Sequence, residues 1–385
     1  MNTVLRSTCA LMVACAFAAA AHAQPKFDVR DGDRFVFLGG GLFERDLRYG
    51  YIETFLTARF HDLNLTFRNL AWAGDTVFGS ARAGFDTAAQ GYERMIKAVN
   101  DAKPSVVFLY MGQNEAFDGK SGLKRFNEGL TRLLSDLDAT GARIVIISPT
   151  LLENLGPPLP DPAEQNEKMK LYAAVLKEVA TENNYYFADL TRPLHYGANQ
   201  PIAPLTGNGL HFTNYGYWKL AQELLVSLGY VVPLIDAQGE QPFELNDEVF
   251  FMPRMPHGAP ETAQAKEIFQ TLQFGGLPEG KYTLTSDSGD VKTTTAAEWA
   301  EGIRLEDIPE VRQVEELRKT IIEKNRLFFN QWRPQNETYI FGFRKYEQGR
   351  FAEETPQFDP LIAEFEKRIA ELRVPKQHTY RFVQQ

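Results

Sequence analysis

The feature that most constrains the fold is a regular alternation of apolar and amphipathic stretches between residues 34 and 230. Short runs rich in Val, Ile, Phe and Tyr recur between longer stretches with helical spacing of their apolar residues. A run that is apolar at nearly every position suits a strand covered on both faces, as in a parallel sheet with helices on each side. The alternation therefore predicts a three-layer α/β domain.

Five runs are the expected strands, and five stretches between and after them are the expected helices. In one such stretch Leu130, Leu133 and Leu137 recur at helical spacing. The expected strands are residues 34–38, 65–70, 105–111, 143–148 and 185–190, and the expected helices are residues 51–60, 91–100, 123–137, 164–181 and 215–228.

The pattern changes after Pro233, where the α/β domain is expected to end and two further regions are expected to follow. The α/β domain itself is assigned to residues 24–233. Residues 234–304 form a small β-containing region, because a strand-like run at 281–285 is followed by turn residues at 286–290. Residues 305–385 form a helical region that packs on the main domain; its helices are expected at 308–331 and 360–373.

The first 23 residues are interpreted as a signal peptide. Arg6 precedes an apolar stretch, and Ala21-His22-Ala23 has the small-x-small form of a cleavage site. Cys9 and Cys15 both lie in the part removed, so no disulfide is expected in the mature chain. Residues 12–15 loosely resemble a lipoprotein cleavage box, which leaves lipidation as the alternative. No later stretch has the roughly 18 apolar residues of a membrane span, and we expect a periplasmic or extracellular protein.

Composition and charge exclude several classes of protein. With 44% hydrophobic and 24% charged residues, the 385-residue chain is neither collagen, coiled coil nor wholly disordered. A net charge of −9 argues against a nucleic-acid or anionic-membrane partner, since both are bound mainly by Lys and Arg. The histidines lack metal-ligand spacing, so no metal is predicted, and no cofactor motif is complete. A small molecule or a carbohydrate is the expected ligand.

Polar segments follow three of the expected strands and precede the last helix of the domain. They are Gly-Gly-Gly-Leu-Phe-Glu-Arg at 39–45, Ala-Trp-Ala-Gly-Asp-Thr at 71–76, Gly-Gln-Asn-Glu at 112–115 and Asn-Gly-Leu-His at 208–211. In a parallel α/β sheet the ligand crevice lies beyond the carboxyl ends of the strands. We therefore expect these four segments to meet at one crevice.

The four segments resemble, in order and spacing, the four conserved blocks of the SGNH or GDSL hydrolases, which are esterases, lipases and carbohydrate deacetylases. The resemblance covers about residues 34–228. It implies a flavodoxin-like fold with a five-stranded parallel sheet. It also implies that Gly74 and Asn114 supply oxyanion-hole donors and that His211 is the catalytic base.

Two positions depart from the family pattern. Gly41 stands where the family has its nucleophilic serine, and Asn208 stands where an aspartate orients the histidine. Glycine has no side chain to attack a carbonyl, and asparagine cannot stabilise an imidazolium by charge. In serine proteases the corresponding Asp-to-Asn change costs about 10⁴ in rate. The chain therefore resembles a divergent, exported subgroup of the family.

Two functions are consistent with these residues. In the first, an exported hydrolase acts on an ester, such as an acyl or acetyl group on carbohydrate, with non-standard catalytic residues. His211 would deprotonate a water in the place of the serine hydroxyl, and the Gly41 and Gly74 N–H groups with Asn114 would bind the oxyanion. A carboxylate would assist His211, with Glu44 as the first candidate. The alternative is a catalytically inactive SGNH fold that binds a polysaccharide or a partner protein.

Five further side chains are assigned to the crevice. Asp75 and Glu115 are the other carboxylates beside the expected oxyanion donors, and Trp72 offers a flat apolar face. Pairing of these carboxylates with arginines is the structural alternative for each of them. Arg333 and Glu337, from the C-terminal region, are expected near the mouth of the crevice.

Overall fold

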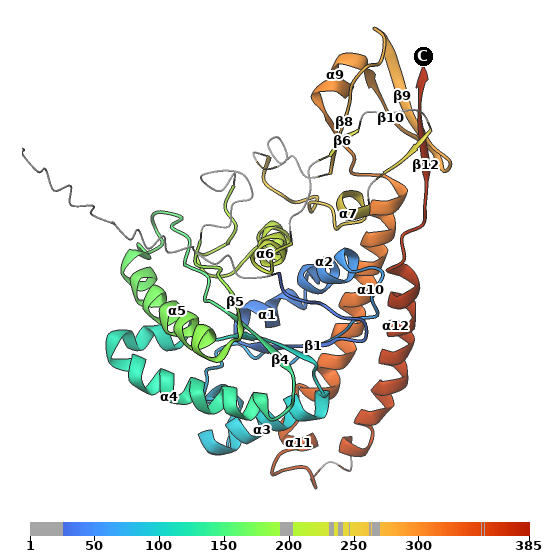
Figure 1. The fold of residues 1–385 in the computed structure, drawn as a ribbon. Helices are drawn as coiled ribbons and strands as arrows, with labels where there is room; N and C mark the ends of the chain where they lie inside the picture. Colours follow the sequence, from blue (N-terminus) through green and yellow to red (C-terminus); the bar gives the residue numbers. More distant parts are fainter. Residues whose placement is uncertain are drawn as a thin grey trace, which may run out of the picture.

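The computed structural model describes residues 26–192, 203–230, 235–237, 242–245, 247–261, 263, 270–347, 349 and 351–385 (Figure 1). The expected signal peptide lies outside these residues. None of the described helices is both long and apolar enough to cross a membrane.

The centre of the molecule is a five-stranded sheet, and every pair of neighbouring strands in it is parallel. Its order is β2-β1-β3-β4-β5. The strands are β1 (Arg34–Gly39), β2 (Thr66–Asn69), β3 (Val106–Tyr110), β4 (Arg143–Ile147) and β5 (Tyr186–Ala188). The five-stranded parallel sheet expected from the sequence is thereby confirmed, each strand within a few residues of its expected bounds.

Alternate residues of each strand face opposite layers, which explains why the strands are apolar throughout. Phe35 and Phe37 of β1 pack on one face, with α1 (Gly41–Asp46), α2 (Tyr51–Arg59) and α6 (Asn214–Ser227). Val36 and Leu38 pack on the other face, with α3 (Ala88–Ala102), α4 (Gly119–Asp138) and α5 (Ala163–Asn183). The sheet is thus the middle layer of three.

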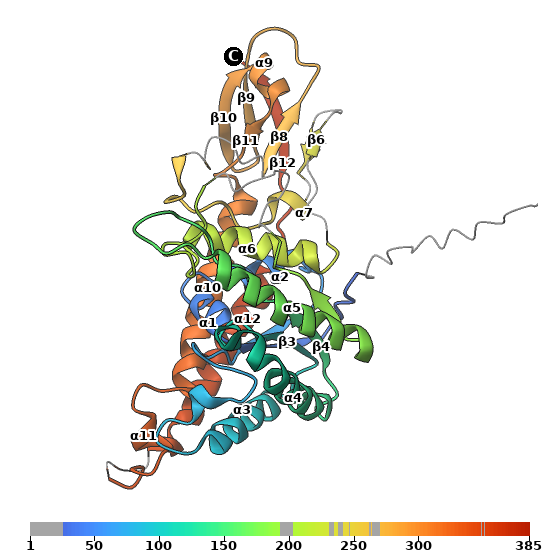
Figure 2. The ribbon, with the colours of Figure 1, turned by 90° about the vertical axis from the view of Figure 1, so that its left-hand side faces the viewer.

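A second unit of short strands lies beyond the α/β domain (Figure 2). Its four-stranded sheet contains β7 (Phe243–Glu244), β9 (Lys281–Ser286), β10 (Gly289–Thr295) and β12 (Thr379–Gln384), in the order β10-β9-β12-β7. A three-stranded sheet joins β11 (Ile303–Arg304), β8 (Thr271–Phe274) and β6 (Ile235–Ala237). Small helices α7 (Asp247–Phe250) and α9 (Ala296–Glu301) lie beside them.

Strand β12 was not among the expected elements, because the sequence assigned residues 305–385 to a helical region with helices at 308–331 and 360–373. Tyr380 and Phe382 alternate with exposed residues, and both pack into the apolar core of the small β unit. The last strand of the β unit therefore comes from the end of the chain, which follows the two long helices in the sequence.

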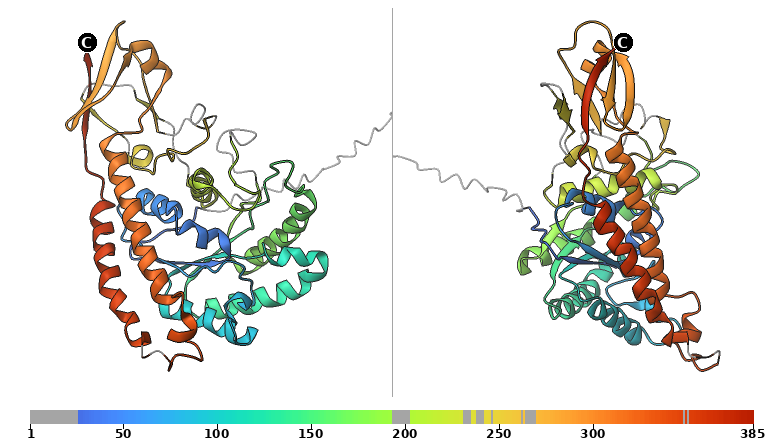
Figure 3. Two further views of the ribbon diagram at one scale, coloured as in Figure 1. Left: turned by 180° about the vertical axis from the view of Figure 1, so that it is seen from behind. Right: turned by 90° about the vertical axis from the view of Figure 1, so that its right-hand side faces the viewer.

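Two antiparallel helices, α10 (Pro309–Trp332) and α12 (Phe358–Leu372), run along the side of the α/β domain (Figures 1 and 3). Lys324 of α10 forms a buried 2.5 Å ion pair with Glu53 of α2, and Asn325 donates to the same carboxylate at 2.7 Å. Lys324 also donates to the carbonyl of Phe67 in the edge strand β2, at 3.3 Å. Removing one partner of a buried pair typically costs about 3–5 kcal/mol, so this contact fixes α10 to the domain.

Candidate active site

The three consecutive glycines at the end of β1 have different structural requirements. Gly39 has φ +141°, and a Cβ there would lie 2.0 Å from the Tyr110 carbonyl oxygen, so no other residue fits. A Cβ on Gly40 would lie 3.6 Å from Asn114 Nδ2, and one on Gly41 would meet only Ala73 Cβ, at 4.0 Å. The fold therefore requires glycine at Gly39 alone, and it leaves room for a side chain at Gly41.

The expected oxyanion donors come together at the carboxyl ends of β1, β2 and β3. Asn114 Nδ2 donates to the carbonyl of Asp75 at 2.7 Å, which ties the third segment to the second. The amide has two hydrogens, so one donor remains. Gly41 is the first residue of α1, where a helix leaves N–H groups without intrahelical partners. Gly74, with φ +83°, adjoins Asp75.

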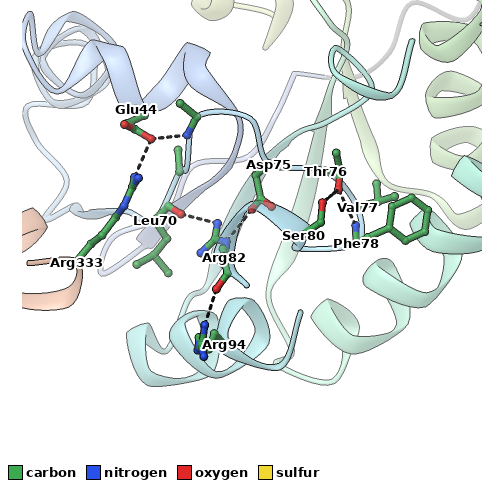
Figure 4. Close-up of polar contacts among 12 residues, drawn as sticks. Glu44, Leu70, Asp75, Thr76, Val77, Phe78, Ser80, Arg82, Arg94 and Arg333 are labelled. Atoms are coloured by element: carbon green, nitrogen blue, oxygen red, sulfur yellow. Dashed lines mark hydrogen bonds and ion pairs between the residues drawn. The ribbon is translucent and has the colours of Figure 1, made fainter. Parts of the chain in front are cut away.

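Glu115 and Asp75 hold the loops of the crevice together. Glu115 accepts the Gly112 N–H at 2.9 Å and the Val77 N–H at 2.8 Å, and its burial raises the pKa of its carboxyl. Asp75 forms a buried 2.7 Å ion pair with Arg82, which also donates to the Leu70 carbonyl (Figure 4). Burial raises the pKa of Asp75, and Arg82 opposes the rise. Both carboxylates are engaged in structural contacts.

Glu44 lies between the first segment, the second segment and the C-terminal region (Figure 4). Its Oε2 accepts the Ala73 N–H and an Arg333 N–H, the latter at 2.9 Å. The Arg333 guanidinium also lies 3.5 Å from the centre of the Trp72 ring. Arg333 therefore does reach the loop that carries Gly74. Glu337 instead begins the short helix α11 (Glu337–Ile340) and lines a different cavity.

Asn208 and His211 form a compact turn directly before α6. Asn208 Oδ1 accepts the N–H groups of Leu210 at 3.2 Å and His211 at 2.8 Å, and Asn208 Nδ2 lies 3.1 Å from His211 Nδ1. The two backbone bonds fix which end of the amide faces the ring. Because Nδ2 can only donate, Nδ1 must accept. A neutral His211 therefore carries its proton on Nε2.

The surroundings of His211 favour the neutral ring. Partial burial lowers its pKa below 6.5, and the positive charge of Arg45 in α1 lowers it further. The sequence analysis did not assign Arg45 to the surroundings of His211. The sequence could have indicated this neighbour, because Arg45 lies only four residues after Gly41, in the first of the four crevice segments.

A cavity of about 380 Å³ adjoins the two asparagines. Asn114 and Asn208 are at its edge, and it extends between the segment after β4 and the start of α5. Its apolar lining includes Phe117, Leu152 and Met169. The volume lies in the range of about 300–1,000 Å³ typical of ligand pockets. No cluster of three or more potential metal-binding side chains occurs within the described parts of the chain.

A family model and several solved structures match this chain. The model of the GDSL-like Lipase/Acylhydrolase family matches residues 32–219. Among solved structures, the gut microbial diltiazem-metabolizing enzyme BT4096 is similar over 93% of this chain and 99% of its own, with a TM-score of 0.66 and 16% identity. This likeness extends the shared fold to the C-terminal region.

Two shorter structures match about half of this chain. The acetylxylan esterase Axe2 from Geobacillus stearothermophilus is 18% identical over 52% of this chain and 96% of its own, with a TM-score of 0.38. A GDSL-like lipase from Bacteroides thetaiotaomicron is 18% identical over 51% of this chain and 88% of its own, with a TM-score of 0.38. No curated protein matches the sequence.

Proposed function

The chain belongs, through residues 32–219, to the SGNH/GDSL hydrolase superfamily, and from this premise we propose that it is an exported ester hydrolase that works without a serine nucleophile. Family membership supports the ester-hydrolysing function. The proposed substrate is a small-molecule or carbohydrate ester carrying an acetyl or other acyl group. Export is proposed from the leader-like residues 1–23.

The observation that supports the proposal is that the segments of Gly41, Gly74 and Asn114 lie beside one another in the crevice. The Asn114 side chain is bonded to the segment of Gly74 and lies beside Gly40, next to Gly41. The N–H groups of Gly41 and Gly74, with the free amide hydrogen of Asn114, are the proposed oxyanion donors. In proteases such donors alone retain about 10³–10⁴ of rate enhancement over water.

The nucleophile in this proposal comes from solvent. The open space above Gly41 takes the oxygen of a hydroxide ion, which attacks the ester carbonyl carbon. The carbonyl oxygen becomes the oxyanion. Its electron pair then re-forms the carbonyl of the acid as the bond to the alcohol oxygen breaks, and the departing alkoxide takes a proton from water. Glu44, Asp75 and Glu115 are all bonded to structural partners, so none of them is assigned as the base.

His211 has a different role here from the base that the family resemblance implies. Proton abstraction by Nε2 requires the proton of the neutral ring to be on Nδ1, where Asn208 donates instead. Turning the Asn208 amide over would break its two bonds to backbone N–H groups, each worth about 0.5–1.5 kcal/mol. In our proposal, His211 therefore acts as a hydrogen-bond donor to developing negative charge.

The orientation of Asn208 also favours the second candidate function, an inactive SGNH fold that binds a polysaccharide or a partner protein. Only the first candidate function predicts that the protein hydrolyses an ester. The experiment is hydrolysis of 4-nitrophenyl acetate by the purified protein between about pH 6 and 9, together with labelling by a serine-reactive organophosphonate.

We expect slow turnover above the buffer rate that rises about tenfold per pH unit, because hydroxide is the nucleophile, and we expect no phosphonate adduct. A covalent adduct, or a rate that levels off near neutral pH, would contradict the proposed mechanism. Turnover equal to the buffer rate at every pH would establish the inactive alternative.

A further inference from the structure

A second and larger cavity lies away from the crevice, between the α/β domain and the C-terminal helices. It has a volume of about 790 Å³ and shares no lining residue with the cavity beside Asn114. One wall is formed by α3 and the loop before it, and the other by α10, α11 and α12. Figure 2 shows α11 at the same end of the molecule as α3. We call this cavity the lateral groove.

Aromatic rings line both walls of the lateral groove. Phe85, 82% exposed, comes from the α/β domain, and Phe343, 69% exposed, comes from the C-terminal region. Their rings meet edge to face across the groove, 5.8 Å apart. Phe328 and Phe341 add apolar surface from the C-terminal side. Rings exposed to this degree offer flat apolar faces that water does not favour, and they gather at binding sites.

The charges of the groove are nearly balanced, and most are already paired. Arg94 pairs with Asp86, and Lys97 pairs with Asp101 at 2.5 Å. The side chains of the groove with formal charge are Arg34, Arg68, Arg82, Arg94 and Lys97 against Asp86, Asp101, Glu337 and Asp359. A surface of this kind has no strong preference for an anion or a cation.

Polar atoms with fixed positions complete the groove. Gln331 Nε2 donates to Asp359 Oδ1 at 2.7 Å. This bond fixes the orientation of the Gln331 amide and does not involve its oxygen. Arg34 donates to the carbonyl of Ala102 at 3.2 Å and to the Thr66 hydroxyl at 3.4 Å, which uses two of its five N–H groups. Aromatic faces, oriented amides and paired charges suit a neutral ligand with both flat apolar faces and hydroxyl groups.

We propose that the lateral groove is a second, non-catalytic site that binds a neutral oligosaccharide. Trp72 lines the groove and lies two residues before Gly74, so the same short segment contributes to the groove and to the proposed crevice. A polymer held in the groove would keep its ester groups close to the oxyanion donors. Only this link to catalysis rests on the proposed function; binding in the groove does not.

The experiment measures binding by the quenching of tryptophan fluorescence, because Trp72 and Trp332 both line the groove. The probes are xylohexaose, cellohexaose and chitohexaose, added to the full-length protein. Two variants, Phe85→Ala and Phe343→Ala, remove the exposed rings without opening the core. We expect at least one probe to bind, and each variant to weaken that binding about tenfold.

Two control variants separate the groove from the rest of the surface. Tyr346→Ala removes a ring that is 83% exposed, three residues from Phe343, and that does not line the groove. Phe117→Ala removes a 68% exposed ring from the cavity beside Asn114. Neither control is expected to change oligosaccharide binding. Hydrolysis of 4-nitrophenyl acetate is expected to be unchanged in the two groove variants.

Several outcomes would overturn the proposal. They are no binding of any probe at about 10 mM, binding weakened by Phe117→Ala but not by the groove variants, or binding weakened equally by Tyr346→Ala. Quenching by 2-naphthol with no quenching by the three sugars would make the groove a site for aromatic molecules. Because these measurements do not involve turnover, their failure leaves the proposed ester hydrolysis standing, and the reverse also holds.

Discussion

The proposed crevice has two ends: an oxyanion end, at Gly41, Gly74 and Asn114, and a base end, at Asn208 and His211. At the oxyanion end the hydrogen bonds hold the loops in place and leave donors unused, since Asn114 spends one amide hydrogen on the Asp75 carbonyl and keeps the other. At the base end the hydrogen bonds also hold the loop. There, however, the Asn208 side-chain oxygen accepts from the backbone, and its NH₂ group donates to the His211 ring.

The difference shows how little structural change is needed to alter the chemistry of such a site. An aspartate at Asn208 would use one oxygen on the same backbone N–H groups and offer the other as an acceptor to His211 Nδ1–H. Replacing that oxygen by an NH₂ group keeps the shape of the turn and reverses the direction of one hydrogen bond.

The largest effect is expected from restoring the base end. The double variant Gly41→Ser/Asn208→Asp should hydrolyse 4-nitrophenyl acetate about 10³–10⁴ times faster than Gly41→Ser alone, because the aspartate puts the proton of His211 on Nδ1 and frees Nε2 to accept the serine proton. The double variant should also form an organophosphonate adduct. If Gly41→Ser alone is as fast as the double variant, Asn208 does not limit catalysis and the comparison fails.

The next effect concerns the oxyanion end. In the double-variant background, where rates are easy to measure, Asn114→Ala should lower kcat by about 10²–10³, the typical cost of one oxyanion donor. The matched control is Asn127→Ala, an exposed asparagine of α4. A change of less than about threefold on Asn114→Ala would remove Asn114 from the oxyanion hole.

A smaller effect is expected from the support of the oxyanion end. Arg333→Ala removes the partly exposed ion pair with Glu44, whose carboxylate also accepts the Ala73 N–H beside Gly74. Such pairs are worth at most about 1 kcal/mol, so the rate of the double variant should fall by no more than about fivefold. Arg326→Ala, which breaks an exposed ion pair in α10, the helix that ends just before Arg333, should leave the rate unchanged. A greater than tenfold loss would give Arg333 a direct role in catalysis.

The smallest effect is a shift in the titration of His211. Arg45→Gln removes the cation that lowers its pKa, so the pKa should rise. Burial is the larger cause, so the value should stay below 6.5. An NMR titration of the ring protons measures both. A pKa that falls, or that does not move, would show that Arg45 does not act on the ring.

Structural features that depend on residues close together in the sequence could be predicted from the sequence. The strands were predictable because their apolar runs reflect burial on both faces. The role of Gly74 and Asn114 as oxyanion donors came from the family resemblance and stays a prediction. Helix α1 was not predicted, because Gly39 to Gly41 favour a turn and only tertiary packing of Leu42 and Phe43 extends it into a helix.

Contacts between residues far apart in the sequence could not be predicted from its local patterns. The Glu44–Arg333 pair joins residues 289 positions apart, and β12 pairs with β9 across about 95 residues. The direction of the hydrogen bond between Asn208 and His211 depends on which atom of the Asn208 amide faces the backbone. The sequence alone does not specify this orientation.

The direct test of the central claim is the tautomer of His211. In ¹⁵N NMR spectra of protein labelled at histidine, with the signal assigned by its loss in His211→Ala, the neutral ring should carry its proton on Nε2. The Asn208→Asp variant should move the proton to Nδ1, because the aspartate accepts where the asparagine donates. A wild-type ring with its proton on Nδ1 would contradict the account, since His211 would then be free to act as the base.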